Sequence, residues 1–295
     1  MKKPLFRGVC TALVTPFLDE KINYPMAELL IKRQLDAGVK AVVLAGTTGE
    51  SPTLSDEEKL ELFYRGKACA GTDCMIIAGT GSNNTAHAVA LSRDAEQAGA
   101  DGLLVVSPYY NKATPDGLFA HFAAIAHAVS IPIILYNVPS RTGVDIPVSV
   151  YKRLSRIPNI AGVKEASTDI TKIARIRHEC PAEFGIWAGN DDQTVPVISL
   201  GGHGVISVLS NILPEETNAM ALAAINGDFD TAAALQCDLL PLIDLLFCEV
   251  NPIPVKETMR LIGYDCGSCR LPLTLATTTT TSCPTHPMLL PGAIT

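Results

Sequence analysis

The sequence lacks any hydrophobic run that approaches the ~18 residues needed to cross a membrane. Only 18% of its residues are charged, and the formal net charge of −7 argues against nucleic acid or an acidic membrane as a partner. The start, MKKPLFRGVC, does not read as a signal peptide, because Pro4 and Arg7 interrupt it. With 47% hydrophobic residues among 295, we expect a globular protein with a large core.

The patterns of metal and nucleotide sites are also missing. The nine cysteines are scattered and odd in number, which suits a reducing cytoplasm better than a disulfide framework. The pair Cys266 and Cys269 lacks the second pair of ligands that a structural zinc ion needs. No H-E-x-x-H, G-x-G-x-x-G or P-loop pattern occurs. We therefore expect a cytoplasmic protein with no metal and no cofactor.

What the sequence does contain is a repeated strand and helix pattern. Eight apolar runs rich in β-branched residues begin at Gly8, Ala41, Met75, Gly102, Ile131, Ile160, Gly185 and His203. Nearly continuous apolar runs are typical of parallel strands buried on both faces. Amphipathic segments separate them, one of which starts with a capping box at Ser55 and Glu58. Eight such units predict an α/β fold, a (β/α)8 TIM barrel, with an open doubly wound sheet as the alternative.

The strand pattern stops after Asn211, where helical segments follow. We expect a catalytic barrel over residues 1–224 and a C-terminal helical extension over 225–270. Residues 271–295 contain no Asp, Glu, Lys or Arg, but carry five consecutive threonines and several prolines. Such a composition cannot form an ordinary amphipathic helix, so we expect an irregular tail.

Lys164 stands out in the stretch IAGVKEAST, because it follows a short apolar strand. Burial of an ammonium group is costly, and a buried amine that loses its proton is a nucleophile suited to forming a Schiff base. The alternative is that the strand ends here and Lys164 points into water. If the strand alternates, Lys164 shares a side with Ile160 and Gly162, and the small Gly162 leaves room for a ligand.

Other unusual polar residues fall at the carboxyl ends of predicted strands, where a barrel has its active site. Tyr136 ends the strand before that of Lys164. Arg141 follows in a loop where it could pair with a carboxylate, and the turn at Thr47 and Thr48 could hold an anion. An amine, a phenol, hydroxyls and an arginine predict aldol-type chemistry on a 2-oxo acid through an imine. The alternative is a set of unrelated structural features in a non-catalytic barrel.

Several stretches, in this order, resemble those of the dihydrodipicolinate synthase (4-hydroxy-tetrahydrodipicolinate synthase) family. They are GTTGES, SPYYN, YNVPSRTG, GVKEAS, GGHGVISV and NPIPVK, and the resemblance extends from Phe6 to Leu273. These enzymes are pyruvate-dependent class I aldolases on a (β/α)8 barrel. The resemblance implies a Schiff-base-forming lyase that condenses pyruvate with L-aspartate 4-semialdehyde in lysine and diaminopimelate biosynthesis.

The resemblance also implies roles for individual residues. Its catalytic residues would be Lys164 for the imine, Tyr136 as proton donor and acceptor, and Thr47 and Tyr110 as a proton relay. Its substrate-binding residues would be Thr48 and the Ile206 backbone for pyruvate, Arg141 for the aldehyde's carboxylate, and Gly189. Tyr110 would reach in from a neighbouring subunit, since the family's usual assembly is a homotetramer built from tight dimers.

Two further hypotheses stay open at this point. N-acetylneuraminate lyases and other sugar-acid aldolases share the lysine and the tyrosine, but Arg141 and the Thr47-Thr48 pair favour the synthase. A catalytically silent barrel, with a role in assembly or regulation, is the other hypothesis.

The sequence departs from the family in two places. Feedback-inhibited relatives bind lysine near Ser51, Asn83 and Tyr109; they carry a glutamate at the position of His87 and histidines at those of Asp56 and Lys59. Since His87 supplies no carboxylate for an ammonium group and Lys59 would repel one, we expect weak or absent inhibition by lysine. The tail also lacks the charged amphipathic helix with which relatives end.

Overall fold

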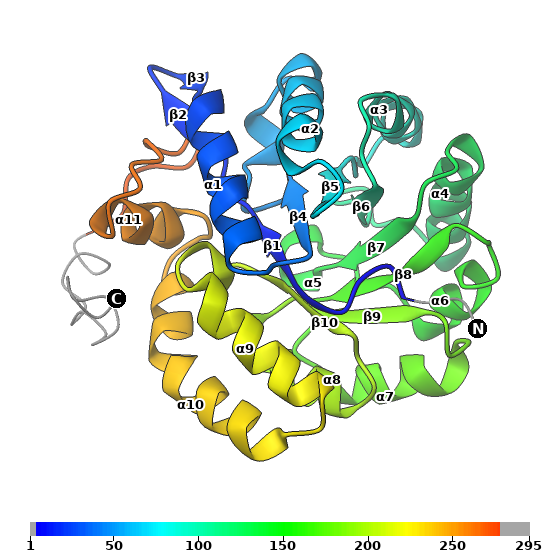
Figure 1. Ribbon diagram of the computed structural model, residues 1–295. Helices are drawn as coiled ribbons and strands as arrows, with labels where there is room; N and C mark the ends of the chain where they lie inside the picture. The colour runs from blue at the N-terminus through cyan, green and yellow to red at the C-terminus, as the bar shows by residue number, and fades with distance from the viewer. Residues whose placement is uncertain (1–3, 278–295) are drawn as a thin grey trace.

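The computed structural model describes residues 4–277, in which eight parallel strands form a closed barrel (Figure 1). The strands are β1 (Gly8–Ala12), β4 (Ala41–Leu44), β5 (Met75–Gly79), β6 (Gly102–Val106), β7 (Ile133–Asn137), β8 (Ile160–Glu165), β9 (Gly185–Ala188) and β10 (Gly204–Ser207). Barrel neighbours are consecutive along the chain, and β1 pairs with both β4 and β10. The TIM barrel prediction is confirmed and the open-sheet alternative is wrong.

A ring of helices surrounds the strands, as the repeated units predict (Figure 1). These helices are α1 (Tyr24–Asp36), α2 (Asp56–Ala70), α3 (Thr85–Gln97), α4 (Pro115–Ala128), α6 (Val148–Leu154), α7 (Ile170–Glu179), α8 (Thr194–Ser199) and α9 (Pro214–Ile225). The predicted capping box begins α2: the Glu58 N–H donates to Ser55 Oγ and the Ser55 N–H donates to Glu58 Oε2. The short helix α5 (Pro139–Thr142) lies in the loop after β7.

The C-terminal extension consists of α10 (Phe229–Leu246) and α11 (Ile253–Leu261). Figure 1 shows α10 beside α9, and α11 near the hairpin of β2 (Phe17–Leu18) and β3 (Lys21–Ile22). Residues 271–277 contain turns without a helix or strand, and the rest of the predicted tail, 278–295, lies outside the described residues. The described helices include none that is both long and apolar enough to span a membrane.

Apolar side chains fill two layers, one inside the barrel and one between the strands and the helices. The inner layer includes Ile77, Ile134, Tyr136, Trp187 and Ile206. Because successive residues of a strand point to opposite faces, each buried strand contributes to both layers. This double burial explains why the strands are recognisable as almost continuous apolar runs.

A bulge between β7 and β8 changes the predicted facing of one residue. Ile133 pairs with Ile160, but the next pair is Ile134 with Gly162, so one residue of β8 is left over. Ile160 therefore lies in the outer layer with Val163, and the prediction that it shares a side with Lys164 is wrong. The space beside Gly162 is also not free for a ligand, since a Cβ there would lie 2.1 Å from the carbonyl oxygen of Gly185.

Candidate active site

Lys164 and Tyr136 lie side by side at the carboxyl ends of β8 and β7. The two residues are direct partners in the strand register, and Lys164 Nζ lies 4.5 Å from the centroid of the Tyr136 ring. Lys164 is only 4% exposed, so the alternative that it points into water is wrong. Beyond the bulge, Gly162–Glu165 pair without interruption with β7 and β9, which fixes the Lys164 side chain toward the barrel axis. An amine and a phenol are thereby held close together, and both side chains are buried.

A buried polar network lies on the outer side of these same two strands. Glu165, next to Lys164, accepts hydrogen bonds from Asn137 Nδ2 at 2.7 Å and from the Tyr151 hydroxyl at 3.0 Å. Lys172 Nζ lies 3.4 Å from Glu165 Oε2 and balances its charge. Burial, and then the Glu165 carboxylate, raise the pKa of Tyr151 well above its usual value, so its hydroxyl stays a donor. The network fixes the strand ends that carry Lys164 and Tyr136.

The Thr47-Thr48 turn follows β4 and reaches the mouth from the other side. Its backbone closes locally, because the Glu50 N–H donates to the Thr47 carbonyl at 3.1 Å. The Thr48 side chain is held by a residue far along the chain: Asn251 Nδ2 donates to the buried Thr48 Oγ1 at 3.0 Å. Asn251 Oδ1 is buried and has no hydrogen-bond partner among the described residues, so it offers a free acceptor beside Thr48.

Arg141 lies on α5 at the rim of the mouth. Its Nη2 donates to the carbonyl oxygen of Asn251 at 3.2 Å, which ties the loop after β7 to the segment before α11. The residue is otherwise exposed, so most of its five N–H donors are available to a carboxylate at the mouth.

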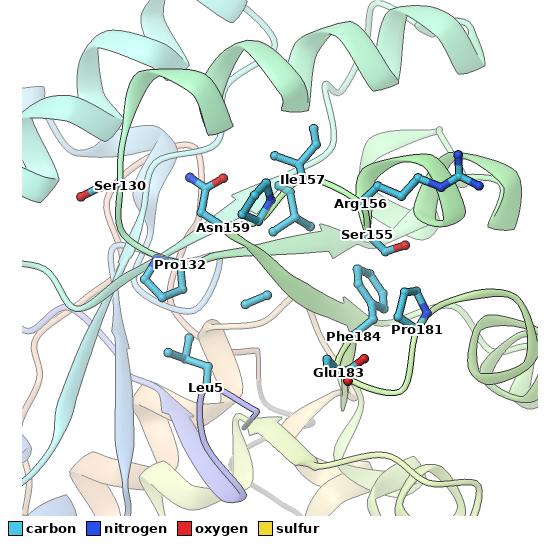
Figure 2. Close-up of a pocket in the computed structure, with 13 residues that line it drawn as sticks. Leu5, Ser130, Pro132, Ser155, Arg156, Ile157, Asn159, Pro181, Glu183 and Phe184 are labelled. Atoms are coloured by element: carbon cyan, nitrogen blue, oxygen red, sulfur yellow. The ribbon is translucent and has the colours of Figure 1, made fainter. Parts of the chain in front are cut away.

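A cavity of about 700 Å³ opens at this end of the barrel and is lined by Thr47, Tyr136, Arg141 and Asn251. A second cavity, of about 770 Å³, lies at the amino-terminal ends of the strands, where Leu5, Pro132, Asn159 and Phe184 line it (Figure 2). None of the predicted site residues is among those that line this second cavity. Thr47, Tyr136 and Arg141 are the predicted site residues that line the carboxyl-end cavity. Lys164 lies against the Tyr136 ring but is not itself among the lining residues.

The two remaining predicted pyruvate contacts lie on neighbouring strands. Ile206 is fully buried inside the barrel on β10. Gly189, just after β9, donates its N–H to the Glu165 carbonyl at 2.7 Å, and a Cβ there would lie 2.5 Å from that of Ala166. A glycine is thus required for β9 to approach β8 at the mouth.

Tyr110 does not line this cavity in the single chain. Its side chain is 89% exposed, and its backbone has φ +70, in the left-handed region that is unfavourable for a non-glycine residue. Its N–H donates to the Thr142 carbonyl at 3.4 Å, which places it near the loop of Arg141. The neighbouring Tyr109 lines the cavity instead.

Three residues at the mouth were missed by sequence reasoning about individual roles: Asn251, Glu50 and Lys256. The stretch NPIPVK contains two of them, but its resemblance to a family motif does not say what they contact. Asp191 is a fourth. Burial raises the pKa of its carboxyl, which accepts the N–H groups of Val208 and Leu209.

The region of His87 is part of the same mouth cavity. His87 Nε2 lies 2.7 Å from Asp56 Oδ2, and Lys59 Nζ lies 3.4 Å from Asp56 Oδ1. Although burial opposes it, the hydrogen bond to His87 and the charge of Lys59 lower the pKa of Asp56. The one carboxylate of this group is therefore already occupied.

The described residues contain no group of three His, Cys, Asp or Glu side chains placed to hold a metal ion. That the protein works without a metal or cofactor stays a prediction.

Comparison with known proteins gives a consistent result. Residues 5–283 match the model of the Dihydrodipicolinate synthetase family. A 4-hydroxy-tetrahydrodipicolinate synthase of Caldicellulosiruptor saccharolyticus is 51% identical over 276 residues, 93% of each chain. The solved dihydrodipicolinate synthase of Aquifex aeolicus is 41% identical with a TM-score of 0.92, over 93% of this chain and 94% of the other. The enzyme of Cyanidioschyzon merolae, solved with lysine bound, is 42% identical with a TM-score of 0.91, over 94% and 95%.

Proposed function

The chain belongs to the dihydrodipicolinate synthetase family, and from this premise we propose that its barrel mouth condenses pyruvate with L-aspartate 4-semialdehyde. The reaction is that of a 4-hydroxy-tetrahydrodipicolinate synthase, a Schiff-base-forming lyase of lysine and diaminopimelate biosynthesis. The observation that carries the proposal is the buried pair of Lys164 and Tyr136 at the carboxyl end of the barrel. The amine of a lysine is the group that forms a Schiff base with a ketone, and here it lies against a phenol that can transfer protons.

Lys164 begins the reaction by attacking the ketone carbon of pyruvate. The carbinolamine loses water to give an imine, and a proton then leaves the methyl carbon to form an enamine. This carbon attacks the aldehyde carbon of the second substrate, and the resulting alkoxide takes up a proton. The substrate's own amine then displaces Lys164 from the imine carbon and closes the ring. One water is released in total, and the lysine is regenerated.

Tyr136 is the group that moves these protons in our proposal. Two observations support this role: the Tyr136 ring lies against Lys164, and Tyr136 lines the mouth cavity that pyruvate would enter. Thr47 lines the same cavity and would pass protons between Tyr136 and Tyr110 of a second subunit. The exposed Tyr110 side chain on a strained backbone supports an assembly in which a neighbour covers it. We propose the homotetramer of tight dimers on this basis.

The binding roles divide between the two substrates. Thr48, the backbone of Ile206 and Gly189 would hold pyruvate beside Lys164. Arg141 at the rim would take the carboxylate of L-aspartate 4-semialdehyde, since a guanidinium group binds a carboxylate with two parallel hydrogen bonds. The cytoplasmic location is also part of the proposal, and the odd, scattered set of nine cysteines supports it.

Reductive trapping tests the central step. Incubation with pyruvate and borohydride should reduce the imine to a stable secondary amine, and peptide mapping should find the adduct on Lys164. The variant Lys164→Arg keeps the charge but has no amine able to form this imine, and it should gain no adduct. The variant Lys152→Arg changes an exposed lysine and should be labelled like the wild type. A folded wild-type sample without an adduct, or with the adduct elsewhere, would refute the proposal.

A further inference from the structure

A buried ion pair joins the loop after β4 to the C-terminal extension. Lys256 lies on α11 and places its Nζ 2.7 Å from Oε1 of Glu50. Glu50 and Lys256 are only 2% and 4% exposed. The two residues are 206 positions apart in the chain, so only the docked extension brings them together.

Both charges of this pair are satisfied by the segment that follows α11. Lys256 Nζ also donates to the carbonyl oxygen of Ser268 at 3.2 Å, and Glu50 Oε2 accepts the backbone N–H of Arg270 at 2.8 Å. The Arg270 guanidinium donates to the two carboxylate oxygens of Glu58 at 2.7 and 2.6 Å. We call Glu50, Glu58, Lys256 and Arg270 the mouth clamp.

An aromatic ring completes the clamp. The ring centroid of Phe17 lies 4.3 Å from Lys256 Nζ and 4.4 Å from Arg270 Cζ, so both cations lie against it. The clamp is thus assembled from five parts of the molecule: the β2–β3 hairpin, the loop after β4, α2, α11 and the chain after α11.

Glu50 belongs to the same turn as the predicted pyruvate contact. It lies two residues after Thr48, and its N–H closes the turn on the Thr47 carbonyl. Its backbone has φ +56, a left-handed conformation that a non-glycine residue keeps only when its surroundings enforce it. Local bonds hold its backbone, including that from Thr53 Oγ1 to the Glu50 carbonyl at 3.0 Å, while Lys256 and the backbone of Arg270 hold its carboxylate. Releasing the carboxylate would therefore let the turn relax and move both threonines.

We propose that Glu50 and Lys256 are positioning residues for the Thr47-Thr48 turn, so that the C-terminal extension sets how pyruvate is bound. The inference rests on the proposed function of the barrel mouth. Neither residue touches the reacting atoms; the pair acts through the turn. A buried ion pair gives little net stability compared with well-packed apolar residues, and its contribution lies in fixing one geometry.

The test compares the clamp with an ion pair at the other end of the barrel. Lys256→Met removes the cation and keeps the length of the side chain, and Glu50→Gln keeps the shape of the partner. The matched control is Lys67→Met. Lys67 Nζ lies 2.7 Å from Asp101, which precedes β6 at the amino-terminal end of the barrel. The measurements are kcat, KM for pyruvate, the midpoint of thermal unfolding and the rate of borohydride trapping.

We expect Lys256→Met to lower kcat/KM for pyruvate by about 10- to 100-fold, mainly through KM, because a misplacement near 1 Å has effects of this size. Lys164 should still be trapped at saturating pyruvate, since β7 and β8 hold it independently. Glu50→Gln should act in the same direction, and the double variant should be no worse than the worse single one. Lys256→Arg should restore part of the loss. Lys67→Met should lower the unfolding midpoint and leave KM unchanged.

Unchanged KM and kcat per folded molecule in Lys256→Met, with only the loss of stability that Lys67→Met shows, would overturn the inference. If Lys256→Met does not fold, KM and kcat per folded molecule of Glu50→Gln decide instead, and unchanged values would overturn the inference. A failure of the proposed function is distinguishable, because the wild-type protein itself would then show no adduct on Lys164.

Discussion

The two sides of the barrel mouth are built in different ways. On the side of β7 and β8, Glu165 bonds to Asn137 and Tyr151, which lie 28 and 14 positions away. On the side of β4, Thr48 bonds to Asn251 and Glu50 bonds to Lys256, 203 and 206 positions away. The nucleophile is thus positioned by neighbouring βα units, whereas the substrate turn depends on the last helices. The comparison shows that residues close together in the chain can position one half of a site, while the other half is positioned by residues about two hundred positions away.

The largest loss of activity is expected on the β7–β8 side, when the hydroxyl group of Tyr136 is removed. We expect Tyr136→Phe to lower kcat by about 10²- to 10⁴-fold, the contribution typical of a general acid or base. Folding and binding of pyruvate should be retained, because the ring still fills its place in the inner layer. Steady-state kinetics with pyruvate and L-aspartate 4-semialdehyde give the result. A loss of less than tenfold would remove Tyr136 from the proton-carrying role.

A smaller effect should follow from weakening the hydrogen-bond network around Glu165, on the outer side of β7 and β8. Tyr151→Phe removes a donor to the buried Glu165 carboxylate, and loss of a hydrogen bond to a charged group costs about 1.5–3 kcal/mol in the free energy of unfolding. Urea denaturation measures this cost. Lys172 and Asn137 still hold Glu165, so kcat should change by only a few-fold.

Tyr151→Phe is also the matched control for Tyr136→Phe, since both lose one tyrosine hydroxyl next to β8, Tyr136 from β7 and Tyr151 from α6. Unchanged stability in Tyr151→Phe, or a loss of kcat as large as that of Tyr136→Phe, would contradict this division between a proton carrier and a structural donor.

The smallest effect is expected on the β4 side, at the group of His87, Asp56 and Lys59, where the sequence predicts weak or absent inhibition by lysine. Because Asp56 is already paired with His87 and Lys59, millimolar lysine should leave the initial rate within about twofold of its uninhibited value. Initial rates at increasing lysine concentration provide the test, and a submillimolar inhibition constant would overturn it. The variant His87→Glu with Lys59→His supplies a carboxylate, removes a cation and should increase inhibition.

Much of the fold could be predicted from the sequence because each strand is buried on both faces. The runs at Ala41 and Ile133 need no information from distant residues to be recognised, and the capping box at Ser55 acts within a single helical turn. The bulge at Ile160 could not be predicted, since an extra residue in a strand leaves the apolar pattern unchanged. The role of Gly162 likewise depends on how near β9 comes.

The residues of the candidate site also differ in whether they could be predicted from the sequence. Lys164 and Tyr136 could be named from the sequence because each interrupts or ends an apolar strand. Glu50 and Lys256 could not, because a charged residue in a loop and one on a helix are ordinary surface residues until the fold buries them together. The role predicted for Tyr110 stays a prediction, because in the single chain its side chain is 89% exposed and does not line the cavity.

The distance of Lys256 from Glu50 along the chain has a consequence for synthesis on the ribosome. Translation proceeds from the N-terminus, so β7 and β8 emerge and can pair well before residue 256 is made. Until α11 leaves the exit tunnel, the Glu50 carboxylate has no cation and the Thr48 hydroxyl has no donor from Asn251. The Thr47-Thr48 turn then depends on local hydrogen bonds, such as that from the Glu50 N–H to the Thr47 carbonyl. A nascent or prematurely terminated chain would therefore carry its reactive lysine without a finished place for pyruvate. Activity appears only once nearly the whole polypeptide has been released.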